Sequence, residues 1–112
     1  MRENDIICLR HMLDAALEAR SFVRGKKRNG LNKDRRLVLA LVKSIEIIGE
    51  AATRVSKEYR AITPQIPWLN IIGMRNRLIH AYFDINLDIL WQTVVDDLPP
   101  LIEELEKIVP RT

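Results

Sequence analysis

The sequence is poor in the residues that build several common kinds of functional site. It has one cysteine, Cys8, which excludes an intrachain disulfide and a cysteine-based metal cluster. Its carboxylates and histidines do not have the spacing of metal ligands, so we expect neither a metal site nor a cofactor. Cys8 together with a distant His11 or His80 is too thin a basis for a thiol enzyme.

Long apolar runs are also missing. The longest uninterrupted run covers residues 37–42 and is far too short to span a bilayer. The charged N-terminus, residues 1–5, is not followed by an apolar stretch of signal-peptide length. Together with the single cysteine, these features predict a cytoplasmic protein with no membrane partner.

Glycine and aromatic residues are scarce, whereas leucine, isoleucine, alanine, glutamate and arginine are abundant. The chain has four glycines and 5% aromatic residues, with 47% hydrophobic and 29% charged residues. This composition is typical of an ordered globular protein and favours helices over a β-sandwich or a barrel. At 112 residues we expect a single domain over residues 1–112, small enough to gain considerably from a partner subunit.

Two helices are predicted in the first half of the chain. Apolar residues spaced three and four apart predict a helix over residues 2–23, which Gly25 ends. After a basic turn over residues 26–32, a second helix is expected over residues 33–60 with Asn32 as its N-cap. Its apolar stripe is wide, so we expect other helices or a second subunit to cover it on two sides. The inner part of this stripe comprises Leu37, Leu41, Ile45, Ile48, Ala52 and Val55.

The second half of the chain is also predicted to be helical. A third helix should begin at Pro67 and fade near residues 83–84. Asn86 can cap a fourth helix, which the pair Pro99 and Pro100 then restarts or kinks before a last apolar segment. No strand pattern competes with the helical one. The predicted fold is therefore an all-α, up-and-down bundle of four to five helices.

Charge is distributed unevenly along the chain. Eight of the 18 basic residues lie between Arg20 and Arg36, with Asp34 as the only acid among them. From Ile79 onward there are seven acids against Lys107 and Arg111. A basic middle and an acidic C-terminal arm suit attraction between subunits and recruitment of a polyanion such as a nucleic acid. A solvated loop with solubilising charge explains the basic stretch equally well.

Two glutamates interrupt the apolar stripe of the second predicted helix. Glu46 and Glu50 are one turn apart, and either of them could pair with an arginine of the third helix. The alternative is that both face solvent beside Lys43 and Arg54, and we favour this alternative.

The third predicted helix combines an apolar ladder with Arg75, Asn76, His80 and Tyr82, which cost free energy to bury without partners. A histidine can give or take the proton of a ribose hydroxyl or of a leaving oxygen near neutral pH. An arginine holds a phosphate and offsets charge that develops in the transition state. The asparagine can orient the imidazole or the phosphate, and the tyrosine offers a hydroxyl beside them. The set suits metal-free phosphodiester cleavage, with RNA as substrate because its 2′-OH supplies an internal nucleophile.

Helix geometry bears on how these groups could meet. Each residue of an ideal helix advances by about 100°, which makes Asn76 and His80 neighbours one turn apart and places Tyr82 in the row of Arg75. Arg75 and His80 are then about 140° apart around the helix. Their convergence would need the long arginine side chain, an altered last helical turn, or a second copy of the helix across a two-fold axis. The last of these would make a homodimer part of the site.

Each motif residue also has an ordinary structural explanation. His80 could be a hydrogen-bonded histidine at an interface, and Arg75 and Arg77 could pair with the acidic C-terminal helix. Tyr82 could be a helix-end aromatic residue with its hydroxyl in water. From the residues alone, a catalytic site and a purely structural helix both remain open.

The segment from Arg75 to Tyr82 resembles the signature of the HEPN superfamily, an arginine followed after four to six residues by a histidine. More narrowly, it resembles the R-x4-H-x-Y form of the HepT-like toxins. Residues 45–52 and 83–101 are also similar to that family, so the resemblance covers nearly the whole chain. Arg77 is an extra arginine, but it lies too close to His80 to offer a competing register.

The resemblance implies an all-helical toxin that forms a homodimer and cleaves RNA without a metal in a cleft lined by both motifs. It implies that Arg75 and His80 are the catalytic pair and that Asn76 supports them. It also implies a nucleotidyltransferase antitoxin that adds AMP to Tyr82, whose phosphate would obstruct the cleft. The alternative is a catalytically silent helical module that binds a nucleotidyltransferase partner or is modified by it.

Overall fold

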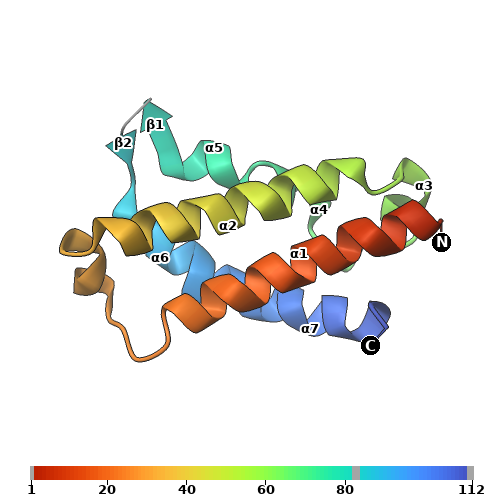
Figure 1. Cartoon of the computed structure of the whole chain (residues 1–112). Coiled ribbons are helices and arrows are strands. Elements are labelled where there is room, and N and C mark those ends of the chain that lie inside the picture. The colour runs from red at the N-terminus through yellow and green to blue at the C-terminus, as the bar shows by residue number, and fades with distance from the viewer. Residues whose placement is uncertain (1, 82–83, 111–112) are drawn as a thin grey trace.

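The computed structural model describes residues 2–81 and 84–110, which form a helical bundle with one small hairpin (Figure 1). None of the described helices is long and apolar enough to cross a membrane. The predicted all-α architecture is confirmed, although two of the predicted helices are divided into shorter ones. In chain order the elements are α1 (Glu3–Phe22), the 3-10 helix η1 (Arg28–Asn32), α2 (Arg35–Arg54), α3 (Lys57–Ala61), α4 (Trp68–Ile72), α5 (Met74–Leu78), β1 (Ile79–Ala81), β2 (Asp84–Ile85), α6 (Leu87–Gln92), the π-helical turn η2 (Thr93–Asp97) and α7 (Leu98–Ile108).

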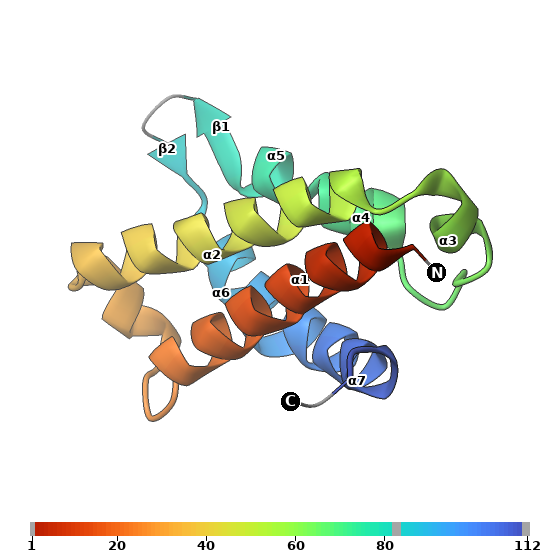
Figure 2. The ribbon, with the colours of Figure 1, turned by 45° about the vertical axis from the view of Figure 1, so that its right-hand side comes forward.

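Helices α1 and α2 form a long antiparallel pair, and α7 packs along α1 (Figures 1 and 2). The buried face of α1 includes Ala15, Ala16 and Ala19, whose small side chains let neighbouring helices approach closely. Helix α2 contributes fully buried Leu41 and Ile45 to the same core. Helices α4 and α5 pack on another side of α2, so this helix is covered on two sides as its wide apolar stripe predicted.

The second predicted helix is two helices in the structure. Helix α2 ends at Arg54, Val55 has extended backbone, and α3 begins at Lys57. The prediction of Asn32 as N-cap of α2 is wrong, because Asp34 takes that place and its Oδ1 accepts the N–H of Leu37 at 3.1 Å. A carboxylate is a strong acceptor at the positive end of a helix dipole, which explains why the helix begins there.

A buried aspartate from α1 fixes the break between α2 and α3. Asp5 is 2% exposed, and its Oδ1 accepts the backbone N–H of Ser56 at 2.7 Å. Its Oδ2 accepts the hydroxyl of Ser56, also at 2.7 Å. The Ser56 oxygen in turn accepts the N–H of Tyr59 and thereby caps α3. Burial raises the pKa of Asp5, but the hydrogen bonds from Ser56 outweigh it and hold the pKa below its ordinary value.

The third predicted helix is also interrupted and ends early. Helix α4 ends at Ile72, α5 ends at Leu78, and residues 79–81 form β1 instead of continuing the helix. Strand β1 pairs antiparallel with β2, with Ile79 opposite Ile85. Both are β-branched residues, which favour extended backbone. The expectation that strands are absent is therefore wrong for this hairpin, whose connecting residues 82–83 lie outside the described residues.

The C-terminal half follows the sequence prediction more closely. Asn86 caps α6, with its Oδ1 accepting the N–H of Ile89 at 3.0 Å. The chain then passes through the π-helical turn η2 into α7, whose first turn contains Pro99 and Pro100. These prolines have no N–H to continue the α-helical ladder, and the N–H of Leu98 bonds to the carbonyl of Thr93, five residues back.

The Asp5 network predicts a pH-dependent loss of stability. Replacement Asp5→Asn should lower the free energy of unfolding by about 1–3 kcal/mol at pH 7, because it weakens two buried hydrogen bonds. The folded-state pKa of Asp5 is lowered, so its stabilisation is present at neutral pH and is lost as the pH falls below about 4. Urea unfolding followed by circular dichroism should therefore show a smaller difference between variant and wild type at pH 3.5 than at pH 7.

The matched control for this measurement is Asp14→Asn, which changes an exposed aspartate of the same helix. It should leave stability nearly unchanged at both pH values. An equal loss for Asp5→Asn at pH 3.5 and pH 7 would contradict the assigned role of the ionised carboxylate.

Candidate active site

Helix α5 presents the arginine and the asparagine of the motif on its exposed side. Met74 and Leu78, one turn apart, are buried and dock the helix onto the core. Arg75, Asn76 and Arg77 are exposed as a consequence. The side chains of Arg75 and Asn76 are therefore accessible from solvent.

Arg75 forms an ion pair with Glu46 of α2. The Nε–H of Arg75 donates to Oε1 of Glu46 at 3.0 Å. The Oε2 of Glu46 lies 4.0 Å from Nζ of Lys43, so the carboxylate has a cation on each side. The preference for Glu46 facing solvent is therefore wrong, and the alternative of a pair with a motif arginine is confirmed, whereas Glu50 is exposed as expected.

A small hollow of about 170 Å³ lies beside this ion pair. Its walls come from α2 on one side and from α4 and α5 on the other. In this hollow, Arg75 and Asn76 of α5 lie next to Glu46 and Glu50 of α2. The residues around it are Ile45, Glu46, Gly49, Glu50, Thr53, Ile72, Arg75 and Asn76.

The histidine of the motif lies on a strand and not on a helix. Because α5 ends at Leu78, the prediction that His80 follows Asn76 by one helical turn is wrong, and the backbone of His80 belongs to β1. The N–H of Asn86 donates to the carbonyl of Leu78 at 2.7 Å and joins the far end of the hairpin to the helix end. Tyr82, the residue expected to carry AMP, lies outside the described residues.

The basic stretch lies at the same end of the bundle as the hairpin (Figures 1 and 2). Arg28 of η1 donates from Nε to Oδ1 of Asp88 at 2.7 Å, which ties this stretch to the start of α6. A second bond joins its Nη1 to Oδ1 of Asn32, also at 2.7 Å. The other basic side chains from 24 to 36 are exposed, namely Arg24, Lys26, Lys27, Lys33, Arg35 and Arg36.

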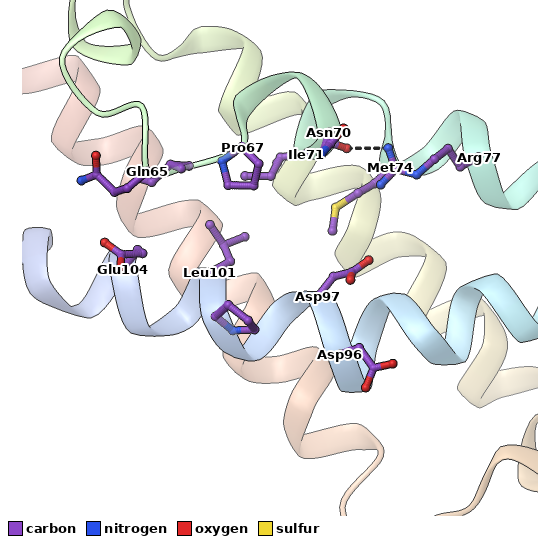
Figure 3. A pocket seen from close by; sticks show the side chains of 12 residues that line it. Gln65, Pro67, Asn70, Ile71, Met74, Arg77, Asp96, Asp97, Leu101 and Glu104 are labelled. Carbon is purple, nitrogen blue, oxygen red and sulfur yellow. Dashed lines mark hydrogen bonds between the residues drawn. The ribbon is translucent and has the colours of Figure 1, made fainter.

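A larger pocket of about 470 Å³ lies between α4 and α5 on one side and η2 and α7 on the other (Figure 3). Met74 and Arg77 line it, whereas Arg75 and Asn76 line the hollow beside α2. The Nη1 of Arg77 donates to the carbonyl of Asn70 at 2.9 Å (Figure 3). Sequence reasoning missed this pocket, because its walls come from segments that show no common motif.

Two other kinds of site can be compared with the structure, a reactive thiol at Cys8 and a metal centre. Cys8 is buried, and burial raises the pKa of its thiol, which keeps it protonated and unreactive at neutral pH. Among residues 2–81 and 84–110, no three histidine, cysteine, aspartate or glutamate side chains are grouped so that they could hold a metal ion.

Comparison with known proteins gives a consistent set of relatives. The family model described as "Ribonuclease HepT-like" matches residues 12–108. A protein of Caldanaerobacter subterraneus named as a candidate RNase is 37% identical over 103 residues, 92% of either chain. The "Probable ribonuclease HepT" of Thermococcus cleftensis is 39% identical over 75 residues, 67% of this chain and 68% of its own. A candidate RNase of Methanocaldococcus jannaschii is 33% identical over 95 residues, 85% of this chain and 87% of its own.

The match to the family model extends across the helices that form the candidate site. No solved structure matches the chain. The family model encloses Glu46, Arg75, Asn76 and His80 together with the core that holds α2 and α5 in place. The chain therefore belongs to the HepT-like ribonuclease family.

Proposed function

We propose that this ribonuclease is the toxin of a toxin–antitoxin pair and cleaves RNA without a metal ion, at a site completed by a second copy of the chain. Family membership supports RNA cleavage. The observation that carries the proposed site is Arg75, an exposed arginine on α5 that immediately precedes the strand of His80. The similarity of residues 75–82 to the R-x4-H-x-Y signature supports the toxin role.

The proposed reaction uses the nucleophile that RNA itself carries. The imidazole of His80 accepts the proton of the 2′-OH, and the 2′ oxygen attacks the adjacent phosphorus. The bond from phosphorus to the 5′ oxygen breaks, that oxygen takes a proton from water, and the imidazolium of His80 returns its proton to solvent. Arg75 binds the phosphate oxygens and offsets their growing negative charge, while the amide of Asn76 orients the phosphate or the imidazole. The products are a 2′,3′-cyclic phosphate and a 5′-hydroxyl.

The arrangement of α5 and β1 supports a site shared between two copies. The guanidinium of Arg75 is turned toward Glu46 on α2. Strand β1 is extended and advances by about 3.3 Å per residue, which carries His80 away from the last helical turn. In both views β1 and β2 extend away from the helices (Figures 1 and 2). A two-fold related copy can therefore bring its own hairpin to this arginine without disturbing either bundle.

The exposed basic residues near the hairpin provide a place for the rest of the RNA strand. Five of them, from Lys26 to Arg36, lie on the loop before η1, directly after η1 and at the start of α2. Phosphate groups of a bound strand would release counterions at such a surface, so recruitment weakens as salt rises. This surface supplies affinity for RNA in general and no base specificity.

Regulation is proposed to act through Tyr82. A nucleotidyltransferase antitoxin would transfer AMP to the phenolic oxygen, with pyrophosphate leaving from ATP. The negative charge of the new phosphodiester would compete with the RNA phosphate for the donors of the proposed cleft. Inhibition then follows from occupation of the cleft as well as from charge.

Cleavage by the pure chain is the first test. The wild type should cut RNA in excess EDTA and leave 2′,3′-cyclic phosphate ends, detectable by mass spectrometry of the fragments. His80→Ala should lower the rate by at least about 100-fold, because it removes the proposed base. In an inducible bacterial host without antitoxin, only the wild type should arrest growth.

The controls separate this activity from contamination and from misfolding. His80→Ala should have the circular dichroism spectrum and melting temperature of the wild type. Equal cleavage by both proteins, or equal tolerance by the host, contradicts the proposal and favours the catalytically silent module.

The shared site predicts complementation between two inactive variants. Arg75→Ala and His80→Ala should each retain only a small residual activity alone, about 1% of the wild type or less. After the two are mixed under conditions that exchange subunits, about one quarter of wild-type activity should return, because half the dimers are mixed and each has one intact site. Cleavage assays on the mixture, with light scattering to verify the dimer, measure this. A mixture as inactive as its components would place both residues in the same subunit's site.

Modification of the tyrosine has a direct readout. Co-expression with a partner nucleotidyltransferase should add AMP-sized mass increments to the wild type, measured by intact-mass spectrometry. These increments should be absent from Tyr82→Phe, which lacks only the acceptor oxygen, and present in the matched control Tyr59→Phe. Increments that persist in Tyr82→Phe would put the acceptor elsewhere.

A further inference from the structure

We propose that Glu46 is a positioning residue for Arg75: it holds the guanidinium through Nε and leaves the Nη edge free for the RNA phosphate. The inference rests on the proposed function, since it takes Arg75 to be the phosphate-binding group. It adds a residue of α2 to a site otherwise built from α5 and β1.

The geometry of the ion pair supports this division of the guanidinium. An arginine has five N–H donors in a rigid plane. The donor directed at Glu46 is the Nε–H, with its nitrogen 3.0 Å from Oε1. The two terminal nitrogens form the outer edge of the plane, which matches two oxygens of a phosphate. The side chain of Arg75 is 53% exposed, so this outer edge is accessible to a substrate.

Glu46 is well placed to act as a fixed point. It lies on the 20-residue helix α2, next to the fully buried Ile45 and two residues before the fully buried Ile48. Its own side chain is only 26% exposed. Arg75, in contrast, extends from a five-residue helix that is too short to be stable alone. The contact therefore transfers the rigidity of α2 to the long and otherwise mobile side chain of the arginine.

A carboxylate near the bound phosphate needs a compensating charge. Lys43, one turn before Glu46, has its Nζ 4.0 Å from Oε2. With a lysine on one side and the arginine on the other, the negative charge of Glu46 is offset before the phosphate arrives. The set as a whole keeps one net positive charge for the phosphate.

The test compares cleavage by a truncated, a conservative and a control variant. Glu46→Ala should lower kcat/KM by about 100-fold, the scale of a loss of alignment in a reacting site. Glu46→Gln keeps an oxygen that accepts the Nε–H, so it should restore most of the activity. Glu103→Ala, an exposed glutamate on α7, should behave as wild type. Equal activity of Glu46→Ala and wild type, or a higher activity in the variant, would overturn the positioning role.

A double variant shows whether Glu46 acts through Arg75. Glu46→Ala in an Arg75→Ala background should cause no further loss, because the group it positions is already absent. A full additional 100-fold loss in that background would assign Glu46 a different role and would contradict the inference. Melting temperatures of all variants should lie close to that of the wild type, which excludes general unfolding.

A spectroscopic readout is independent of RNA cleavage. In proton–nitrogen correlation spectra, the Nε–H signal of Arg75, identified by its absence from Arg75→Lys, should exchange slowly with water. Glu46→Ala should shift it and speed its exchange, and Glu103→Ala should not. An unchanged signal in Glu46→Ala overturns the inference even if the protein cleaves RNA. If Glu46→Ala shifts the signal but the wild type cleaves no RNA, the proposed function is wrong and the positioning role falls with it. The contact between Glu46 and Arg75 then still stands.

Discussion

The burial of α2 is the constraint on which the rest of the structure depends. This helix is covered by α1 on one side and by α4 and α5 on another, and Leu41, Ile45 and Ile48 are fully buried. Each such side chain contributes about 1.5–3 kcal/mol when it leaves water. Helix α4 packs closely on α2 at Gly49, where an added Cβ would lie 3.7 Å from the carbonyl oxygens of Ile71 and Ile72, an ordinary van der Waals distance.

This packing also decides what can reach the site. With most of its circumference covered, α2 leaves a strip accessible next to α5, and that strip carries Glu46. The motif helix therefore docks against a rigid surface that already bears an acid. A five-residue helix gains from such a neighbour both its place in the core, through Met74 and Leu78, and the orientation of its arginine. The same buried helix thus supports both the stability and the geometry of the site.

The sequence predicted most helices correctly because apolar periodicity is a local signal, but it predicted several helix ends wrongly. The break after Arg54 depends on Asp5, which is 51 residues from Ser56 in the chain. The end of α5 at Leu78 depends on pairing between Ile79 and Ile85, which no periodicity of residues 67–84 reveals. Asn86, by contrast, caps α6 through a contact three residues away, and that cap was predicted. Ends set by distant side chains were missed, and a nearby cap was not always assigned correctly either, since Asp34 and not Asn32 caps α2.

The same distinction applies to the candidate site. The exposure of Arg75 and Asn76 follows from the motif and from the buried Met74 and Leu78 beside them. The pairing of Arg75 with Glu46 was not the favoured prediction, because a glutamate in an amphipathic helix has the same local pattern whether it faces water or a neighbouring helix. The position of His80 was predicted wrongly for a further reason. Residues 79–81 are extended, so the angular spacing of side chains around a helix does not apply to them.

The link between Asp5 and Ser56 makes the stability of α3 depend on α1. Helix α3 is five residues long and begins at a serine whose N–H and hydroxyl are both held by the first turn of α1. A helix of that length does not persist alone in water. Helix α3 is therefore stable only while α1 is packed against the end of α2, so the first turn of α1 helps to hold in place the region that leads into the motif helix.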